Sequence, residues 1–285
     1  MALARCLALA ALGLALVPAA TFTAQGARPR PPIPAGVEVL RERPYAGPAG
    51  PALDAYVHPR ARRPRPALLV VHGGSWISGD KRDMAGVARA AAARGLAVFN
   101  VNYTLALPGR PGFPGQHEEL REAVRWIRAH AKRLHVDPEL IGALGTSAGG
   151  HLAALLAMAG DGPRDAGGRI AAAVTWSAPT TLDGLDGWLG LAVRNLLGCL
   201  AEACGGRAVA ASPVTHATPD DPPMLIVHSR HEIVPVEHAH GLAESLRGAG
   251  VTTRLRLLAG ARHGRSYAHD VLSGSLRFLV RRLTP

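Results

Sequence analysis

Short apolar runs alternate with helix-like segments through most of the chain. The runs cover residues 67–71, 96–102, 140–144, 170–176, 224–227 and 254–258. Continuous apolar runs are typical of strands buried on both faces, and the intervals between them leave room for crossover helices. The pattern therefore predicts an α/β fold whose doubly wound, mostly parallel sheet is flanked by helices.

Segments with helical spacing fall between these runs, at residues 83–93, 117–134, 148–159, 236–248 and 266–283. The stretch 180–206 is rich in Gly and Asp and interrupts the alternation, and its length predicts a functional insertion over the strand ends. We find no internal repeat and no second domain. With 48% hydrophobic residues, the chain can bury one large core, and we expect a single domain over residues 67–285.

The first 24 residues have the layout of a signal peptide. Arg5 is the only early charge, residues 6–17 are apolar, and small residues follow. This run is shorter than the about 20 residues of a transmembrane helix, so we expect cleavage after Ala20 or Ala24 and no stable membrane insertion afterwards. The mature protein is then secreted or periplasmic, and an uncleaved membrane anchor is the alternative.

Residues 25–66 are rich in proline and arginine. They contain two candidate strands, near residues 36–40 and 53–56. Because proline cannot donate a hydrogen bond within a sheet, we interpret this region as a leader followed by a hairpin at the sheet edge.

Two cysteines, Cys199 and Cys204, remain after cleavage, since Cys6 should leave with the signal peptide. An even number of cysteines in an oxidising compartment predicts a short disulfide loop, and two buried free thiols are the alternative. No cysteine or histidine spacing fits a zinc site, so we expect no metal.

The formal net charge is +11, and nearly all the basic residues are arginine. A basic surface attracts phosphate groups. These arginines, however, are scattered along the sequence, without interleaved aromatic residues or a recognisable nucleic-acid module. We interpret the charge as a solvated surface and expect no nucleic-acid partner.

The pentapeptide Gly145-Thr-Ser147-Ala-Gly149 lies between the apolar run 140–144 and a helix-forming segment. Flanking glycines permit a tight, strained turn that lifts the serine to its tip, where a base can reach it. The pentapeptide alone is a weak signal in a glycine-rich chain, but the strand before it and the helix after it make it specific. Ser147 is therefore the candidate nucleophile.

A second glycine-rich turn, His72-Gly73-Gly74-Ser75-Trp76, follows the apolar run 67–71. Such a turn can aim backbone N–H groups at the oxyanion that forms when a serine attacks a carbonyl. The candidate donors are the N–H groups of Gly74, Ser75 and Ala148, with Gly73 as a further one. The alternative is a purely structural turn between a strand and a helix.

A base is also required, and His263 lies just past the last apolar run, 254–258. Parallel strands all end at one edge of a sheet, so this position brings a histidine to the same edge as Ser147. His269 is the nearest rival, but it falls within the expected final helix.

These features together resemble the α/β-hydrolase superfamily, and within it the secreted carboxylesterases of the hormone-sensitive-lipase and feruloyl-esterase-like groups. The resemblance runs from residue 67 to the C-terminus and includes Val101-Asn-Tyr, Asp137-Pro, Ala211-Ser-Pro-Val-Thr-His and Asp221-Pro-Pro. It implies a serine hydrolase that cleaves carboxylic esters through an acyl-enzyme on Ser147, with no cofactor.

The acid segment departs from the family pattern. Similar proteins carry His-Gly-x-x-Asp-x-x-Val-Pro, whereas this chain has His228-Ser-Arg-His-Glu-Ile-Val-Pro235. Counting forward from His228 places Glu232 at the acid position, and counting back from Pro235 places His231 there. A carboxylate is needed to orient the base and to stabilise the imidazolium, so we predict Glu232 as the third catalytic residue.

Two other functions stay open. A peptidase or amidase of the same fold usually carries a further domain, for which this length leaves no room. A hydrolase-like binding protein without turnover is favoured only by the altered acid segment. The expected partner is a small or polymeric ester, and short-chain acyl esters, acetylated polysaccharide, feruloyl esters and polyester oligomers all fit. The oligomeric state is not predicted.

Overall fold

The computed structural model describes residues 32–160, 167–199 and 203–284. The predicted signal peptide and the first part of the leader lie outside the described residues. The described residues belong to one compact unit, Pro31–Pro285, which includes the predicted hairpin as well as the domain that follows it.

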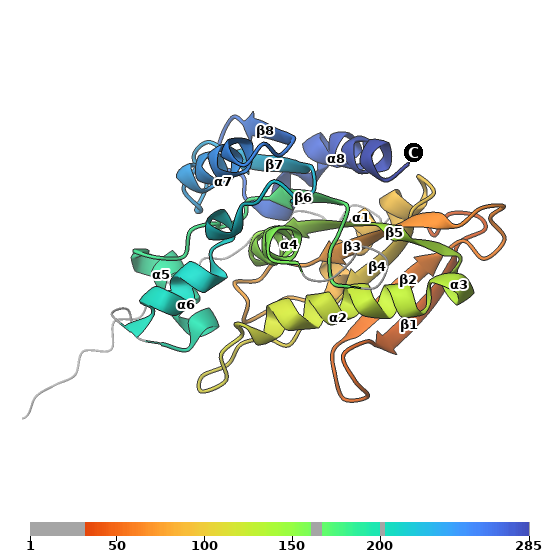
Figure 1. The fold of residues 1–285 in the computed structure, drawn as a ribbon, viewed down its shortest axis with the longest axis horizontal. Helices are drawn as coiled ribbons and strands as arrows, with labels where there is room; N and C mark the ends of the chain where they lie inside the picture. The colour runs from red at the N-terminus through yellow and green to blue at the C-terminus, as the bar shows by residue number, and fades with distance from the viewer. Residues whose placement is uncertain (1–31, 161–166, 200–202, 285) are drawn as a thin grey trace, which may run out of the picture. The chain divides into compact units, whose positions relative to one another are not determined.

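Eight strands form one sheet (Figure 1). They are β1 (Glu38–Pro44), β2 (Ala52–Val57), β3 (Arg65–Val71), β4 (Ala97–Val101), β5 (Val136–Thr146), β6 (Ala172–Trp176), β7 (Met224–Ser229) and β8 (Thr253–Leu258). Their order in the sheet is β1-β2-β4-β3-β5-β6-β7-β8. The two pairs that involve β2 are antiparallel and the remaining five are parallel. The predicted fold class is therefore confirmed.

Burial explains why apolar runs in the sequence predicted these strands. Every residue of β4, β6 and β7 is buried, which requires continuous apolar runs. The edge strand β8 alternates instead, with Arg254 and Arg256 exposed. The hairpin β1–β2 lies at the other edge, as its prolines predict. Strand β5 begins at Val136, earlier than the predicted 140, because Arg65 of β3 pairs with Val136 beyond an irregularity.

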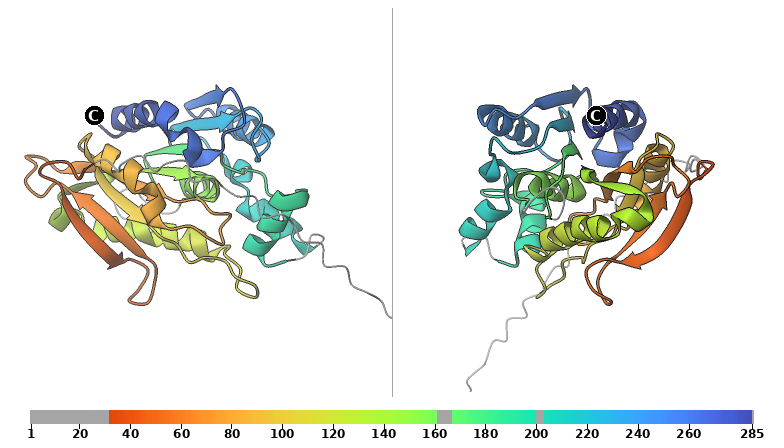
Figure 2. Two further views of the ribbon diagram at one scale, coloured as in Figure 1. Left: turned by 180° about the vertical axis from the view of Figure 1, so that it is seen from behind. Right: turned by 45° about the vertical axis from the view of Figure 1, so that its right-hand side comes forward.

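Helices cover both faces of the sheet (Figures 1 and 2). Their bounds are α1 (Ala85–Ala92), α2 (Gly115–Ala129), α3 (Ala131–Leu134), α4 (Ala148–Met158), α5 (Gly187–Leu197), α6 (Gly205–Ala211), α7 (Glu237–Gly248) and α8 (Ala268–Leu283). One hydrophobic cluster joins the sheet to α2, α4 and α7, and the other joins it to α1 and α8. The helix predicted over 117–134 is divided at His130, whose backbone leaves helical geometry at φ −104° and ψ 4°.

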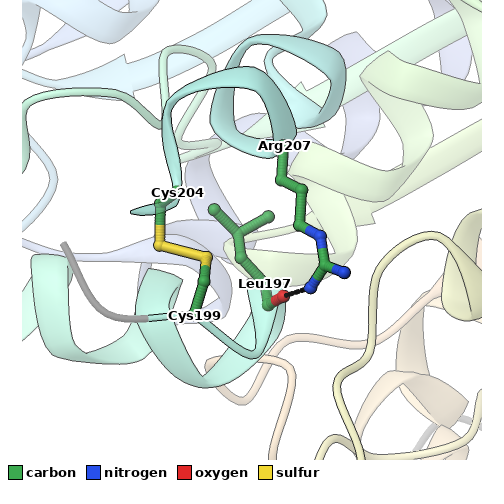
Figure 3. The surroundings of a disulfide bond; sticks show 4 residues. All are labelled: Leu197, Cys199, Cys204 and Arg207. Carbon is green, nitrogen blue, oxygen red and sulfur yellow. Dashed lines mark hydrogen bonds between the residues drawn. A yellow bond between two sulfur atoms is a disulfide. The ribbon is translucent and has the colours of Figure 1, made fainter. Parts of the chain in front are cut away.

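The predicted insertion contains the helix α5 and the start of α6. Cys199 and Cys204 form a disulfide between these helices (Figure 3). Beside it, Nη1 of Arg207 donates a hydrogen bond of 2.9 Å to the carbonyl of Leu197 at the end of α5. The insertion follows β6, so it begins at the edge of the sheet where the parallel strands end.

Candidate active site

Ser147 occupies a sharp turn between β5 and α4. Its backbone has φ 53° and ψ −123°, a conformation that residues other than glycine rarely adopt. A Cβ atom at Gly145 would lie 2.0 Å from the carbonyl oxygen of Gly149, and one at Gly149 would lie 2.2 Å from that of His72. Both flanking glycines are therefore required by steric exclusion. The N–H of Ser147 donates to the carbonyl of Trp176 at 2.7 Å and fixes the turn to the end of β6.

His263 lies in the loop after β8, directly before a short 3₁₀ helix (Gly264–Tyr267). Its Nε2 lies 2.8 Å from Oγ of Ser147, 116 positions away in the sequence. Its Nδ1 contacts Oε2 of Glu232. The His263 side chain is 24% exposed, so it is open to solvent on one side while its other side faces the carboxylate. His269, the rival base, lies in α8 and contacts Asp270.

Glu232 lies in the loop after β7, and its side chain is fully buried. Its Oε1 accepts hydrogen bonds from the N–H of Ser229 at 3.0 Å and from the hydroxyl of Ser177 at 2.7 Å. His231, the other residue that counting placed at the acid position, is exposed. The shortened segment thus still presents a carboxylate to His263, and the structure brings all three predicted residues together.

His228 is buried and lies against the Glu232 carboxylate. Its Nε2 lies 2.9 Å from the carbonyl of Val234 and 3.2 Å from Oε1 of Glu232. Both neighbours are acceptors, so Nε2 carries the proton. Burial lowers the pKa of His228 and outweighs the opposing effect of the Glu232 charge. The imidazole therefore adds a neutral N–H donor beside the carboxylate.

Ser177 and Tyr267 are two further residues of the site that the sequence analysis missed. Ser177 directly follows β6 and has a φ of 54°. Its Oγ donates to Glu232, accepts from the N–H of Gly264 at 2.7 Å and lies 2.7 Å from the Tyr267 hydroxyl. Burial raises the pKa of Tyr267, so its hydroxyl stays protonated. The position of Ser177, just after a buried strand at the sheet edge that carries Ser147, was an available signal.

The turn 72–76 lies against the nucleophile. A Cβ atom at Gly73 would lie 2.9 Å from the carbonyl oxygen of Thr146 and 3.1 Å from Cβ of Ser147. Gly74, Ser75 and Trp76 all have positive φ, at 123°, 53° and 64°. Three of the four predicted oxyanion donors, Gly73, Gly74 and Ser75, therefore come from a turn that lies directly against Ser147.

Buried hydrogen bonds hold this turn. The indole N–H of Trp76 donates to Nδ1 of His151 at 3.1 Å, and Nε2 of His151 donates to the carbonyl of Ala211 at 2.7 Å. Burial lowers the pKa of His151 to about 4, so the ring is neutral and its single N–H points to Ala211. His72 is buried, stacks on Tyr103 and bonds to Gly73 through Nδ1, which agrees with an orienting role for His72.

Ala148 begins α4 directly after Ser147. The first N–H groups of a helix have no partner within the helix, and the helix dipole favours negative charge at this end. Ala148 and the turn 72–76 thus approach Ser147 from two different elements. Among the described residues, no group of three or more His, Cys, Asp or Glu side chains could hold a metal ion.

Comparison with known proteins places this geometry in a family. The family model BD-FAE matches residues 53–246. Esterase LipC of Mycobacterium tuberculosis is 29% identical over 75% of this chain and 55% of its own length. Carboxylesterase NlhH of the same organism is 34% identical over 44% of this chain and 38% of its own length. The chain spans about half the length of the curated relatives it matches.

Solved structures extend the comparison. A thermophilic esterase from Thermogutta terrifontis, Est2, is 28% identical with a TM-score of 0.70, covering 89% of this chain and 95% of that one. The same esterase phosphonylated by sarin is 27% identical with a TM-score of 0.72, covering 90% of this chain and 99% of that one. The expected resemblance is confirmed: the chain has the α/β-hydrolase fold and belongs to the BD-FAE family.

Proposed function

We propose that this protein is a serine carboxylesterase that cleaves carboxylic esters through an acyl-enzyme on Ser147. One observation carries the proposal, namely the continuous chain of contacts from Ser147 Oγ through His263 to the buried carboxylate of Glu232. A nucleophile, a base within hydrogen-bond reach and a group that orients the base are the parts that acyl transfer requires. The ester-hydrolase names of the relatives support the same reaction.

In the proposed first step, Nε2 of His263 takes the proton of Ser147 while Oγ bonds to the ester carbonyl carbon. The carbonyl oxygen becomes an oxyanion, which accepts hydrogen bonds from N–H groups of Gly73, Gly74, Ser75 and Ala148. When the oxyanion collapses, the bond to the alkoxide breaks and His263 protonates the leaving alcohol. His263 then takes a proton from water, which attacks the acyl group, and the carboxylic acid leaves as Ser147 regains its proton.

Glu232 stabilises the imidazolium that forms on His263 during each step and keeps the proton of the neutral ring on Nδ1. The hydroxyl of Ser177 and the N–H of Ser229 donate hydrogen bonds to this carboxylate. Both donors are neutral, so the carboxylate keeps its negative charge for His263. The acid segment was the feature that favoured a non-catalytic protein. The contacts of Glu232 now support turnover instead, because the missing residue has not removed a carboxylate from His263.

Short acyl groups are the substrate class that the comparisons support. Est2 structures with bound propionate and butyrate are 28% and 27% identical to this chain. We propose that this enzyme also takes esters of short carboxylic acids. We expect the insertion with α5 and the disulfide to border the bound ester, since it leaves the sheet directly beyond β6.

We also propose that the protein acts outside the cytoplasm. The apolar N-terminal run and the disulfide between Cys199 and Cys204 support this location. Among the described residues, no helix is both long and apolar enough to cross a membrane.

The test follows hydrolysis of p-nitrophenyl acetate, butyrate and octanoate by wild type, Ser147→Ala and Ser273→Ala. Ser273 is an exposed serine on α8, so its variant controls for the loss of a hydroxyl group. We expect turnover in wild type and in Ser273→Ala, with a preference for acetate or butyrate, and loss of turnover in Ser147→Ala. A folded wild-type protein that hydrolyses none of these esters would contradict the proposed activity.

A further inference from the structure

An arginine-lined cavity of about 920 Å³ lies between the edge strand β8 and the helix α8. Its apolar lining residues are Leu225, Leu255 and Phe278. Its rim consists of six arginines from three elements: Arg247 of α7, Arg254 and Arg256 of β8, and Arg277, Arg281 and Arg282 of α8. In Figure 1 these elements lie together at the blue end of the sheet.

Strand and helix periodicity direct the arginines into this cavity. Side chains two positions apart in a strand point to the same face, so Arg254 and Arg256 both face α8. On α8, residues 274, 277, 278 and 281 have the spacing of one helix face and line the opposite wall. Position 274 is a glycine, and a Cβ atom there would lie 3.4 Å from Nη1 of Arg256. This distance is an ordinary van der Waals contact, which shows that Gly274 lies beside the Arg256 guanidinium.

The six charges have no acidic counterpart at the cavity. None of its lining residues within the described part of the chain is Asp or Glu. Within the same residues, none of the ion pairs includes one of the six arginines. Helix α2 differs, because its Arg121 and Arg125 pair with Glu118 and Glu122 one turn earlier. An arginine-rich composition therefore does not by itself produce such a cavity.

Like charges that face one another across a concave surface repel each other and focus the field on an anion. Guanidinium groups also bind carboxylate oxygens in pairs. The rise per residue places the Cα atoms of Arg254 and Arg256 about 7 Å apart along β8, and those of Arg277 and Arg281 about 6 Å apart along α8. This spacing suits an anion with one charge on each sugar ring better than polyphosphate, whose charges are closer together.

We propose that the cavity binds a segment of an acidic oligosaccharide that carries one carboxylate on each sugar, such as a chain of uronic acids. A membrane surface fits less well, because the exposed large hydrophobic residues of the described chain lie on other elements. A nucleic-acid strand fits less well too, because Phe278, the aromatic residue of the cavity, is buried and provides no stacking surface.

Contacts of one lining arginine lead from the cavity toward the loop that carries His263, which does not itself line the cavity. Nη2 of Arg256 donates to the carbonyl of Asp270 in the first turn of α8, and the Asp270 carboxylate pairs with Arg262, the neighbour of His263. These contacts link Arg256 to the segment beside His263, while the cavity itself lies at the start of β8. The binding site itself does not depend on the proposed reaction and can be measured in the Ser147→Ala protein.

The test measures binding of a galacturonate hexamer to the Ser147→Ala protein by calorimetry at low ionic strength. The same measurement is made with Arg254→Gln and Arg281→Gln together, and with Arg62→Gln and Arg63→Gln together. Both pairs remove two positive charges, and Arg62 and Arg63 are exposed residues outside the cavity. We expect binding to weaken at least tenfold with the cavity pair and less than twofold with the control pair. The single variant Arg247→Gln provides a second cavity change at an exposed position.

Three results would overturn the proposal. They are an absence of hexamer binding, an equal loss of binding in the cavity and control pairs, and tighter binding of polyphosphate of equal charge. Circular dichroism establishes that each variant is folded. In the Ser147 background, hydrolysis of p-nitrophenyl butyrate should stay within twofold of wild type for both pairs, because neither contains a residue of the proposed reaction.

Discussion

The hydroxyl of Ser177 donates a hydrogen bond of 2.7 Å to Oε1 of Glu232, the carboxylate that contacts His263. Ser177 thus lies one contact behind the acid, at the end of the strand next to that of Ser147 in the sheet. The position of the acid is therefore set by β6 and by the loop at Gly264, as well as by its own shortened segment.

Removing this hydroxyl should slow the reaction. We expect Ser177→Ala to lower kcat about tenfold with little change in KM. The Glu232 carboxylate loses a hydrogen bond that contributes roughly 1.5–3 kcal/mol, and it then orients His263 less well. Ser177→Gly is the matched variant, since glycine relaxes the positive φ of 54°. Full activity in Ser177→Gly would show that backbone strain, and not the hydroxyl, explains the loss.

Glu232→Gln should remove the negative charge with little change in shape. We expect kcat to fall roughly 10³-fold or more, as when an amide replaces the acid of a serine triad, while circular dichroism remains that of the wild type. Glu237→Gln, at an exposed position in α7, is the control for the loss of one carboxylate. Unchanged kcat in Glu232→Gln would show that the triad assignment of this residue is wrong.

Gly73→Ala tests how closely the predicted oxyanion turn approaches the nucleophile. The new Cβ atom would lie 2.9 Å from the Thr146 carbonyl and 3.1 Å from Cβ of Ser147, so the turn must shift. We expect kcat to fall about 100-fold, the scale of losing one oxyanion donor. Gly86→Ala in α1 meets no atom within 4 Å and should instead raise the free energy of unfolding by about 0.5–1 kcal/mol. Equal activity of the two variants would contradict a role for the turn.

Two buried histidines should make stability depend on pH. Burial lowers the pKa of His151 and of His238 to about 4, from an ordinary value of 6.5. Between these values the unfolded chain binds protons that the folded chain does not, so the free energy of unfolding falls as pH decreases from 6.5 to 4. Thermal unfolding across this range measures the effect.

A glutamine variant of His151 measures how much of this pH dependence of stability comes from His151. Glutamine can accept from Trp76 and donate to Ala211 without titrating, so His151→Gln should reduce the change in Tm between pH 6.5 and 4.5. His240→Gln, at an exposed position, should leave that change as it is in the wild type. A wild-type Tm that is constant over this range would contradict the buried-histidine explanation.

The sequence predicted the sheet well because its strands are buried on both faces, and continuous apolar runs follow from that burial. It also placed Ser147, His263 and Glu232 at one edge, since parallel strands end there. Counting alone could not choose between His231 and Glu232, because the choice depends on which side chain turns inward in a shortened loop. Burial of Glu232 and exposure of His231 give the structural answer.

Contacts between distant segments were beyond the sequence. Ser177 belongs to no motif: its place after a buried strand marks it as a candidate, but its bonds to Glu232 and Gly264 span 55 and 87 positions. The arginines were interpreted as scattered, which holds along the sequence but not in space, because β8, α7 and α8 gather six of them around one cavity. Only the arrangement of these three elements in space shows which arginines become neighbours.

The insertion that contains α5 and the disulfide leaves the sheet after β6, whereas the nucleophile, acid and base follow β5, β7 and β8. The segment that we propose to border the substrate and the reacting groups are therefore encoded by separate stretches of the chain. Cys199 and Cys204, five positions apart, join the end of α5 to the start of α6, so this part of the insertion carries its own cross-link. Grafting an insertion from another esterase would then redesign substrate selectivity while the chemical machinery stays in place.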